Sequence, residues 1–233
     1  MTHERKFQDK LPELLDFLVS QKMCDNDRIP SLTDLSVELD VSVARLREQL
    51  EVARVLGVVE VKPKTGIRRL PYTFQPAVRQ SLAYAIAVDP DYFKTFSDLR
   101  NHIEAAYWHQ AVRILTTEDH DDLWQLVKRA QAKLHDHPVQ IPHSEHRALH
   151  LLIYRRLNNP FVIGLLEVYW EAYESIGLDV YTDLDYLDQV WQYHQEMIEA
   201  IRGQDLDHGY DILMRHMNLL FHRTKPVQIH KFE

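Results

Sequence analysis

The spacing of its apolar residues constrains the fold of this chain more than any other feature of the sequence. Over most of its 233 residues, apolar side chains recur at intervals of three and four, and only six residues are glycine. Such spacing gathers apolar side chains on one face of an α-helix. We therefore predict a mainly α fold.

One segment departs from this spacing. Residues 57–71, GVVEVKPKTGIRRLP, carry β-branched residues on both sides of a Lys-Pro-Lys-Thr-Gly turn, which is typical of a small β-hairpin. Three helical patterns precede it: one from Phe7, one after a cap at Ser31 and one after a cap at Ser42. The order helix, helix, turn, helix, hairpin predicts a winged helix-turn-helix of three helices and a hairpin.

Two prolines then indicate a domain boundary, because proline disfavours helix at its own position and at the residue before it. Pro71 and Pro76 flank a short segment, so we predict a winged helix-turn-helix domain at 1–72, a linker at 73–76 and a second domain at 77–233. The second domain is expected to be an all-α bundle of six or seven helices without strands. Their predicted ranges are 77–87, 91–115, 118–134, 142–157, 160–176, 184–202 and 205–223.

Charge and composition narrow the class of protein. The net charge is −8, but residues 1–72 are neutral, with 12 basic and 12 acidic residues, so the first domain is the relatively basic part. No apolar run approaches the length of a membrane span, and the N-terminus is polar, so we expect a cytoplasmic protein without membrane association. A single cysteine, Cys24, cannot form an intrachain disulfide framework.

The first domain resembles the GntR superfamily of bacterial regulators over about residues 7–70. The resemblance rests on residues 29–50, IPSLTDLSVELDVSVARLREQL, and on the hairpin beginning at Gly57. In such a motif the second helix enters the DNA major groove and the hairpin meets neighbouring phosphates. The implied DNA contacts are Ser42, Arg45 and Arg47 in the helix, and Lys62, Lys64, Thr65 and Arg68 in the hairpin, with Gly66 allowing close backbone approach.

The chain also departs from this family. Thr33 and Val43 stand where the family usually has arginine, and Arg45 stands where proline is common, whereas Arg47 matches. We therefore expect an unusual operator sequence. The alternative is a winged-helix domain that has lost DNA affinity and contacts protein.

Four of the fourteen histidines lie in helical patterns of the second domain. His146 and His150 are four residues apart and share a helix face. His194 and His216 occupy the last two helical segments, among apolar residues. Each of them, taken singly, also fits a hydrogen-bonded core histidine.

The second domain resembles the FCD branch of GntR regulators over about residues 91–223. The matching marks are Leu99–Ala106, His146 with Leu149 and His150, Asn159-Pro160, His194 with Ala200, Ile201, Gly203 and Asp205, and His216. Metal-binding members of that branch use an aspartate, a histidine four residues on and two histidines in the last helices. The resemblance implies a metal site at His146, His150, His194 and His216, with His146 at the aspartate position.

Replacing carboxylate by imidazole makes this an all-nitrogen set, which favours zinc, nickel or copper over manganese or magnesium. We predict a divalent transition metal, zinc or nickel. Two alternatives concern the ligand set: His146 swings away and leaves three histidines and a water, or the nearby His143 or Glu145 contributes.

Arg100 matches an arginine that lies in the sensing pocket of the family, and its planar guanidinium suits a carboxylate. The resemblance thus implies a small organic acid as effector. The alternative role for Arg100 is an ion pair with Glu104. Four aromatic residues are candidates for the pocket lining or for the core: Trp108, Tyr169, Trp170 and Tyr173.

These features predict a homodimeric transcription regulator whose affinity for a double-stranded, palindromic operator depends on the effector. Two other functions use the same histidines. A purely structural metal would tie the helices together. A hydrolytic centre would use Glu145 or Glu196 as base, but no His-Glu-x-x-His motif accompanies the cluster, so we do not expect an enzyme.

Overall fold

The computed structural model describes residues 11–21, 27–176 and 183–221. Phe7 and Cys24 lie outside these residues. The chain forms two compact units, Met1–Ser81 and Leu82–Glu233. The helices and hairpin expected from the sequence are present, so the predicted mainly α fold class is confirmed.

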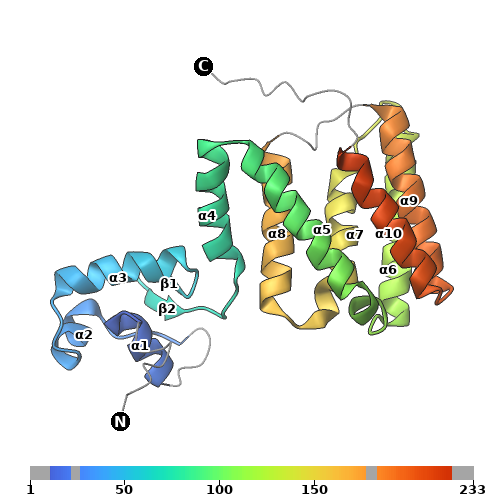
Figure 1. Ribbon diagram of the computed structural model, residues 1–233. Helices are drawn as coiled ribbons and strands as arrows, with labels where there is room; N and C mark the ends of the chain where they lie inside the picture. Colours follow the sequence, from blue (N-terminus) through green and yellow to red (C-terminus); the bar gives the residue numbers. More distant parts are fainter. Residues whose placement is uncertain (1–10, 22–26, 177–182, 222–233) are drawn as a thin grey trace, which may run out of the picture. The chain divides into compact units, whose positions relative to one another are not determined.

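The first unit contains the predicted winged helix-turn-helix (Figure 1). Ser31 and Ser42 cap its second and third helices as predicted, because their hydroxyl oxygens accept hydrogen bonds from the backbone N–H groups of Asp34 and Arg45. Leu14, Leu35 and Leu46 are fully buried in its core. Its helices are α1 (Glu13–Ser20), α2 (Leu32–Glu38), α3 (Val43–Val55) and the first half of α4 (Gln75–Val88).

A two-stranded antiparallel hairpin follows α3, as the sequence predicts. Strand β1 (Val59–Lys62) pairs with β2 (Gly66–Arg69) so that Val59 faces Arg69 and Lys62 faces Gly66. The turn from α3 into β1 requires Gly57, whose φ is +71° and where a Cβ atom would lie 2.5 Å from Pro76 Cγ. The hairpin therefore leaves α3 at a fixed angle.

Helix α4 begins at Gln75, so it includes the last two residues of the predicted linker at 73–76. Proline is tolerated in the first turn of a helix, where its missing N–H has no helical partner. Pro76 therefore does not delay the helix. The two compact units divide within α4, between Ser81 and Leu82.

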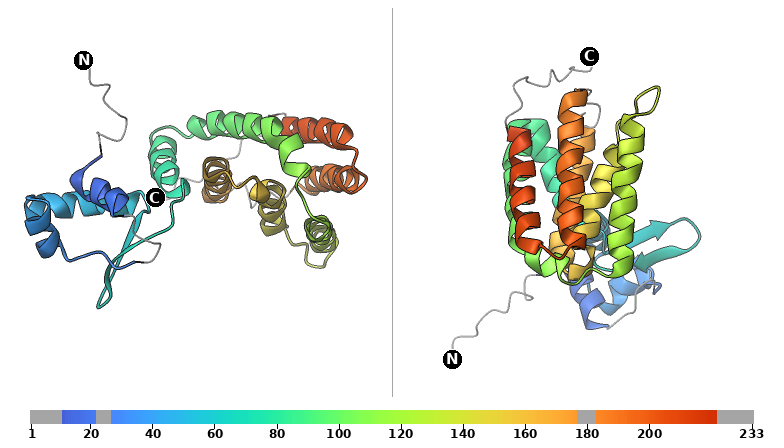
Figure 2. Two further views of the ribbon diagram at one scale, coloured as in Figure 1. Left: turned by 90° about the horizontal axis from the view of Figure 1, so that it is seen from below. Right: turned by 90° about the vertical axis from the view of Figure 1, so that its right-hand side faces the viewer.

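The second unit is a helical bundle. Helix α7 packs against α5, α6 and α8, and α9 packs against α6 and α10; Figure 2 shows α10, α9 and α6 side by side. Trp108, Leu149, Leu166 and Met197 lie fully buried in the shared core. Its helices are α5 (Asp91–Val112), α6 (Thr117–Leu134), α7 (His143–Tyr154) continued by η2 (Arg155–Leu157), α8 (Pro160–Ser175), α9 (Leu184–Arg202) and α10 (Leu206–Phe221). Among the described helices, none is long and apolar enough to cross a bilayer.

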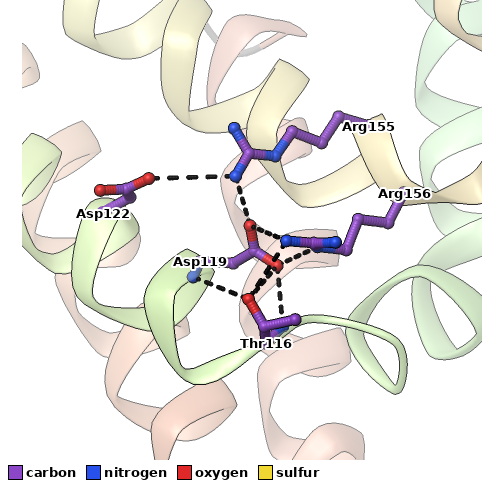
Figure 3. A network of polar contacts seen from close by, with 5 residues as sticks. All are labelled: Thr116, Asp119, Asp122, Arg155 and Arg156. Carbon is purple, nitrogen blue, oxygen red and sulfur yellow. Dashed lines mark hydrogen bonds and ion pairs between the residues drawn. The ribbon is translucent and has the colours of Figure 1, made fainter.

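A polar network fixes the start of α6 against η2 (Figure 3). Asp119 closes a capping box with Thr116, whose backbone N–H donates to Asp119 Oδ2 at 2.7 Å. Arg155 and Arg156 donate to the same buried carboxylate. Burial by itself raises the pKa of Asp119, but the hydrogen bonds from Arg156, Thr116 and Arg155 prevail and hold it well below its ordinary value.

Candidate metal centre

The four predicted histidines converge inside the second unit from three helices. His146 and His150 come from α7, His194 from α9 and His216 from α10, and one ring nitrogen from each lies within 4.8 Å of the others. His150 and His194 are fully buried, and their Nε2 atoms are 3.1 Å apart. His146 keeps some exposure, although its Nε2 is buried.

The donor set fits a transition metal ion. Two histidine nitrogens on one tetrahedral zinc, each about 2.1 Å from the ion, would lie about 3.4 Å apart, close to the spacing of the His150 and His194 nitrogens. The Nδ1 atoms of His194 and His216 are buried without a hydrogen-bond partner among the described residues. Because an unsatisfied buried polar atom is costly, an ion bound at His216 Nδ1 would remove one such cost, whereas His194 Nδ1 would stay unsatisfied if His194 binds through Nε2.

The charge state of the buried rings suits metal binding. Burial lowers the pKa of His150, His194 and His216 well below the ordinary value, and neighbouring histidines or Arg100 lower it further. These imidazoles are therefore neutral, the form that offers a lone pair to a metal.

A buried ion pair lies behind His150. Glu104 and Arg100, both on α5, are almost inaccessible to solvent, and Arg100 Nη2 is 3.0 Å from Glu104 Oε1. His150 Nδ1 lies 3.2 Å from Glu104 Oε2 and 2.9 Å from Arg100 Nη2. Burial raises the pKa of Glu104 to about 7, although Arg100 and His216 oppose the rise. Of these contacts only the one between Arg100 and His150 has hydrogen-bond geometry, and both carboxylate oxygens of Glu104 are buried without a hydrogen-bond partner among the described residues.

Arg100 makes the ion pair that the sequence offered as the alternative to an effector contact. Its guanidinium also lies 4.7 Å from the ring centroid of Tyr169 and donates to Asn101 Oδ1 at 3.1 Å. The effector contact of Arg100 stays a prediction.

Aromatic rings surround the histidine cluster. Trp170 lies 4.6 Å from the His146 ring centroid, and Trp191 lies 4.8 Å from that of His194. Trp191 was not predicted, because helical spacing does not show which of several buried aromatic residues faces the cluster. Trp108, a predicted candidate, instead donates from Nε1 to the backbone oxygen of Leu206.

The other candidate ligands and bases lie outside the cluster. Glu145 forms an ion pair with Lys133 at 2.8 Å, and Glu196 accepts a hydrogen bond from Gln192. His143 lines a cavity next to His146 but is not among the converging nitrogens. The geometry brings together the four histidines named from the sequence and neither of the proposed hydrolytic bases.

In the first unit, the predicted DNA contacts of α3 are exposed at its N-terminal end. Ser42 is occupied as the cap, and its hydroxyl oxygen accepts the Arg45 N–H at 3.3 Å. Arg45 Nη2 lies 2.6 Å from Glu13 Oε1 of α1, so a phosphate would compete with this carboxylate. Arg47, two residues further along α3, is also exposed.

The predicted DNA contacts of the hairpin lie on and beside its turn. Positive φ angles at Lys64 (69°) and Gly66 (79°) shape the turn, and Lys62 Nζ pairs with Glu60 Oε2 at 2.8 Å. Three of these residues are exposed and two are partly buried: Lys62, Lys64 and Thr65 in the first group, Gly66 and Arg68 in the second. Their DNA contacts stay predictions.

Comparison with known proteins identifies the family of the second unit. The FCD domain family matches residues 96–219, more than half of the chain. The chain belongs to the FCD domain family. The predicted resemblance of the second domain to the FCD branch is thereby confirmed.

Solved structures support the fold of both units of this FCD protein. A Streptococcus agalactiae GntR protein matches 91% of this chain and 96% of its own, at 18% identity and a TM-score of 0.65. The Listeria monocytogenes protein Lar, described as controlling expression of the agr system, matches 96% of this chain and 100% of its own, at 12% identity and a TM-score of 0.50. No curated protein sequence matches the chain significantly.

Proposed function

We propose that this FCD regulator senses a small carboxylate at a transition metal held by its four clustered histidines. The observation that carries the proposal is the convergence of one nitrogen each from His146, His150, His194 and His216 to within 4.8 Å. The all-nitrogen set favours zinc or nickel. A bound ion of this kind accepts carboxylate oxygen as a further ligand.

Glu104 and Arg100 prepare His150 for this role. A histidine that binds a metal through Nε2 must carry its proton on Nδ1, and the unpaired Glu104 Oε2, 3.2 Å away, would accept that proton's hydrogen bond after a small adjustment. Without an ion, Nδ1 can instead accept from Arg100 Nη2 while Nε2 donates to His194. The buried pair therefore serves both tautomers of His150.

We further propose that the protein acts as a homodimer on a palindromic operator. Two identical DNA-binding units related by a twofold axis would read two half-sites of opposite direction. The exposed N-terminal end of α3 and the basic turn of the hairpin are the surfaces proposed to meet DNA.

The metal proposal is tested by removing one histidine. His194→Ala should abolish stoichiometric zinc or nickel in purified protein, as measured by elemental analysis and by competition with a chromophoric chelator. His102→Ala is the matched control, because that side chain is 75% exposed and lies outside the cluster. Full metal content in His194→Ala would overturn the proposal.

A structural metal is the second candidate, because the four ligands join α7, α9 and α10. Chelation would then lower the melting temperature without changing effector binding or operator affinity. The sensor proposal expects all three to change.

A further inference from the structure

Helix α3 has one buried side and one exposed side. Four of its side chains are buried in the first unit: Leu46, Gln49, Leu50 and Ala53. Because an α-helix completes a turn in about 3.6 residues, the opposite side carries Ala44, Arg47, Glu48 and Glu51, and all four are exposed. This side would reach furthest into a DNA groove, since the helix is held to its own unit by the other side.

The two carboxylates on the exposed side differ in their contacts. Both oxygens of Glu51 accept hydrogen bonds from Arg54 Nη1, at 2.8 and 2.9 Å. Within the part of the chain that the structure describes, Glu48 forms neither a hydrogen bond nor an ion pair, and the same holds for Arg47 beside it. Glu48 therefore has an unused acceptor in the second turn of α3, close to the end that is proposed to meet DNA.

A carboxylate in the major groove discriminates strongly between bases. It loses water on entering the groove, so it needs a hydrogen-bond donor there. Guanine and thymine present acceptor oxygens at the relevant edge, and adenine presents a donor beside the N7 acceptor, whereas cytosine presents only its N4 amino donor. The neighbouring Arg47 adds a positive charge that offsets the repulsion between Glu48 and the phosphates. Cytosine is thus the base that best satisfies Glu48.

We propose that Glu48 reads a cytosine in each operator half-site by accepting a hydrogen bond from the N4 amino group. The inference rests on the proposed operator binding and adds a residue that determines sequence preference. Of the α3 contacts expected from the sequence, Ser42 is used as the helix cap and Arg45 is paired with Glu13. Base discrimination is therefore assigned to the second turn of α3.

Selection from random DNA duplexes by the full-length protein tests this assignment. The enriched sequences should share a C·G pair in each half-site, and its replacement by T·A should weaken binding by about 5- to 150-fold in fluorescence anisotropy. Glu48→Gln should change the preferred base at that position to adenine, because a glutamine amide can bond both N6 and N7 of adenine. The preferences at the other positions should stay the same.

Glu51→Gln is the matched control, because it makes the same exchange on the same side of α3 at a carboxylate that is already paired. It should select the same sequences as the unsubstituted protein. If Glu48→Gln also selects those sequences, or if both variants change the same base, the inference is wrong while operator binding stands. If the unsubstituted protein enriches no sequence, the proposed operator binding itself is wrong.

Discussion

The Nδ1 atom of His150 lies within hydrogen-bonding reach of an acceptor on Glu104 and a donor on Arg100. Only the acceptor supports the tautomer that presents Nε2 to an ion. We therefore expect the carboxylate of Glu104 to position His150, although it lies on a different helix from every candidate ligand.

Glu104→Gln tests this role. The amide has the same shape but is a weaker acceptor for the Nδ1 proton, so zinc affinity should fall about 10- to 100-fold. The measurement is competition with a chromophoric chelator, at a temperature at which circular dichroism shows the metal-free variant to be folded. Glu196→Gln, on α9 but outside the cluster, should bind zinc like the unsubstituted protein. Unchanged affinity in Glu104→Gln would show that the ion pair only stabilises the core.

A second residue-scale prediction concerns metal choice. His146→Asp restores the carboxylate found at this position in the metal-binding relatives that the sequence resembles. Carboxylate oxygen suits manganese better than imidazole does. The ratio of manganese to nickel affinity should therefore rise at least about tenfold.

His143→Asp is the control for this substitution, because it adds the same carboxylate one turn away, outside the converging nitrogens. Both affinities are measured by calorimetry on metal-free protein. A shift in His143→Asp without one in His146→Asp would make His143, and not His146, the ligand.

At the scale of elements, the start of α6 depends on one buried carboxylate. Asp119 accepts from Thr116, Arg155 and Arg156, and so joins the cap of α6 to η2. Asp119→Asn should lower the free energy of unfolding by about 1 to 3 kcal/mol, because it removes the charged acceptor of several hydrogen bonds. Asp122→Asn is the control, since Asp122 is 54% exposed and lies 3.9 Å from Arg155. Urea unfolding followed by circular dichroism measures both, and equal losses would contradict the prediction.

The same carboxylate predicts a pH dependence. Because the folded protein holds the pKa of Asp119 below its unfolded value of about 4, its contribution to stability is present above pH 4 and is lost as the pH falls further. The acid side of the stability curve should therefore be shallower in Asp119→Asn. An unchanged slope between pH 4 and pH 2 would show that other carboxylates dominate there.

Substitutions at the two ends of α3 should differ in their effect on operator binding. Arg47→Ala at the exposed N-terminal end should weaken operator binding and reduce the slope of log affinity against log salt by about 1, if Arg47 meets one phosphate. Arg54→Ala is the control, because Arg54 lies in the last turn and pairs with Glu51 at 2.8 Å. Fluorescence anisotropy at several salt concentrations distinguishes them. Equal slopes for both variants would place DNA on another surface.

Apolar spacing predicted the elements better than it predicted the site. Helical periodicity and the caps at Ser31 and Ser42 located the helices within a few residues, because burial of one face and satisfaction of the first N–H groups are local effects. The start of α4 was placed late, because Pro76 is compatible with a first turn. Trp191 and the cavity beside His146 depend on the rotation of packed helices, which a single helix pattern does not specify.

Residue spacing predicted only part of the histidine cluster. The spacing of His146 and His150 predicted a shared face, but nothing in the periodicity joins α7 to residues in α9 and α10. Only the resemblance to FCD regulators brought His194 and His216 into the set, and the structure places all four rings together. Long-range convergence of this kind comes from tertiary packing.

At the scale of the whole molecule, the proposed function requires coupling between two units of one chain. The effector must bind one state of the regulator more tightly than another, and the free energy of that preference limits the change in operator affinity. A preference of about 1.4 to 3 kcal/mol corresponds to about a 10- to 150-fold change.

This coupling is reciprocal, which gives the last prediction. If a small carboxylic acid changes the operator affinity of zinc-loaded protein by some factor, saturating operator DNA must change the affinity for that acid by the same factor. The first quantity is measured by fluorescence anisotropy with and without the acid, and the second by calorimetry with and without operator, in one buffer and at one salt concentration. His194→Ala should bind operator with an affinity that the acid does not alter. A response to the acid that survives in His194→Ala would separate effector sensing from the histidine cluster, because the metal could not then be the link between the two units.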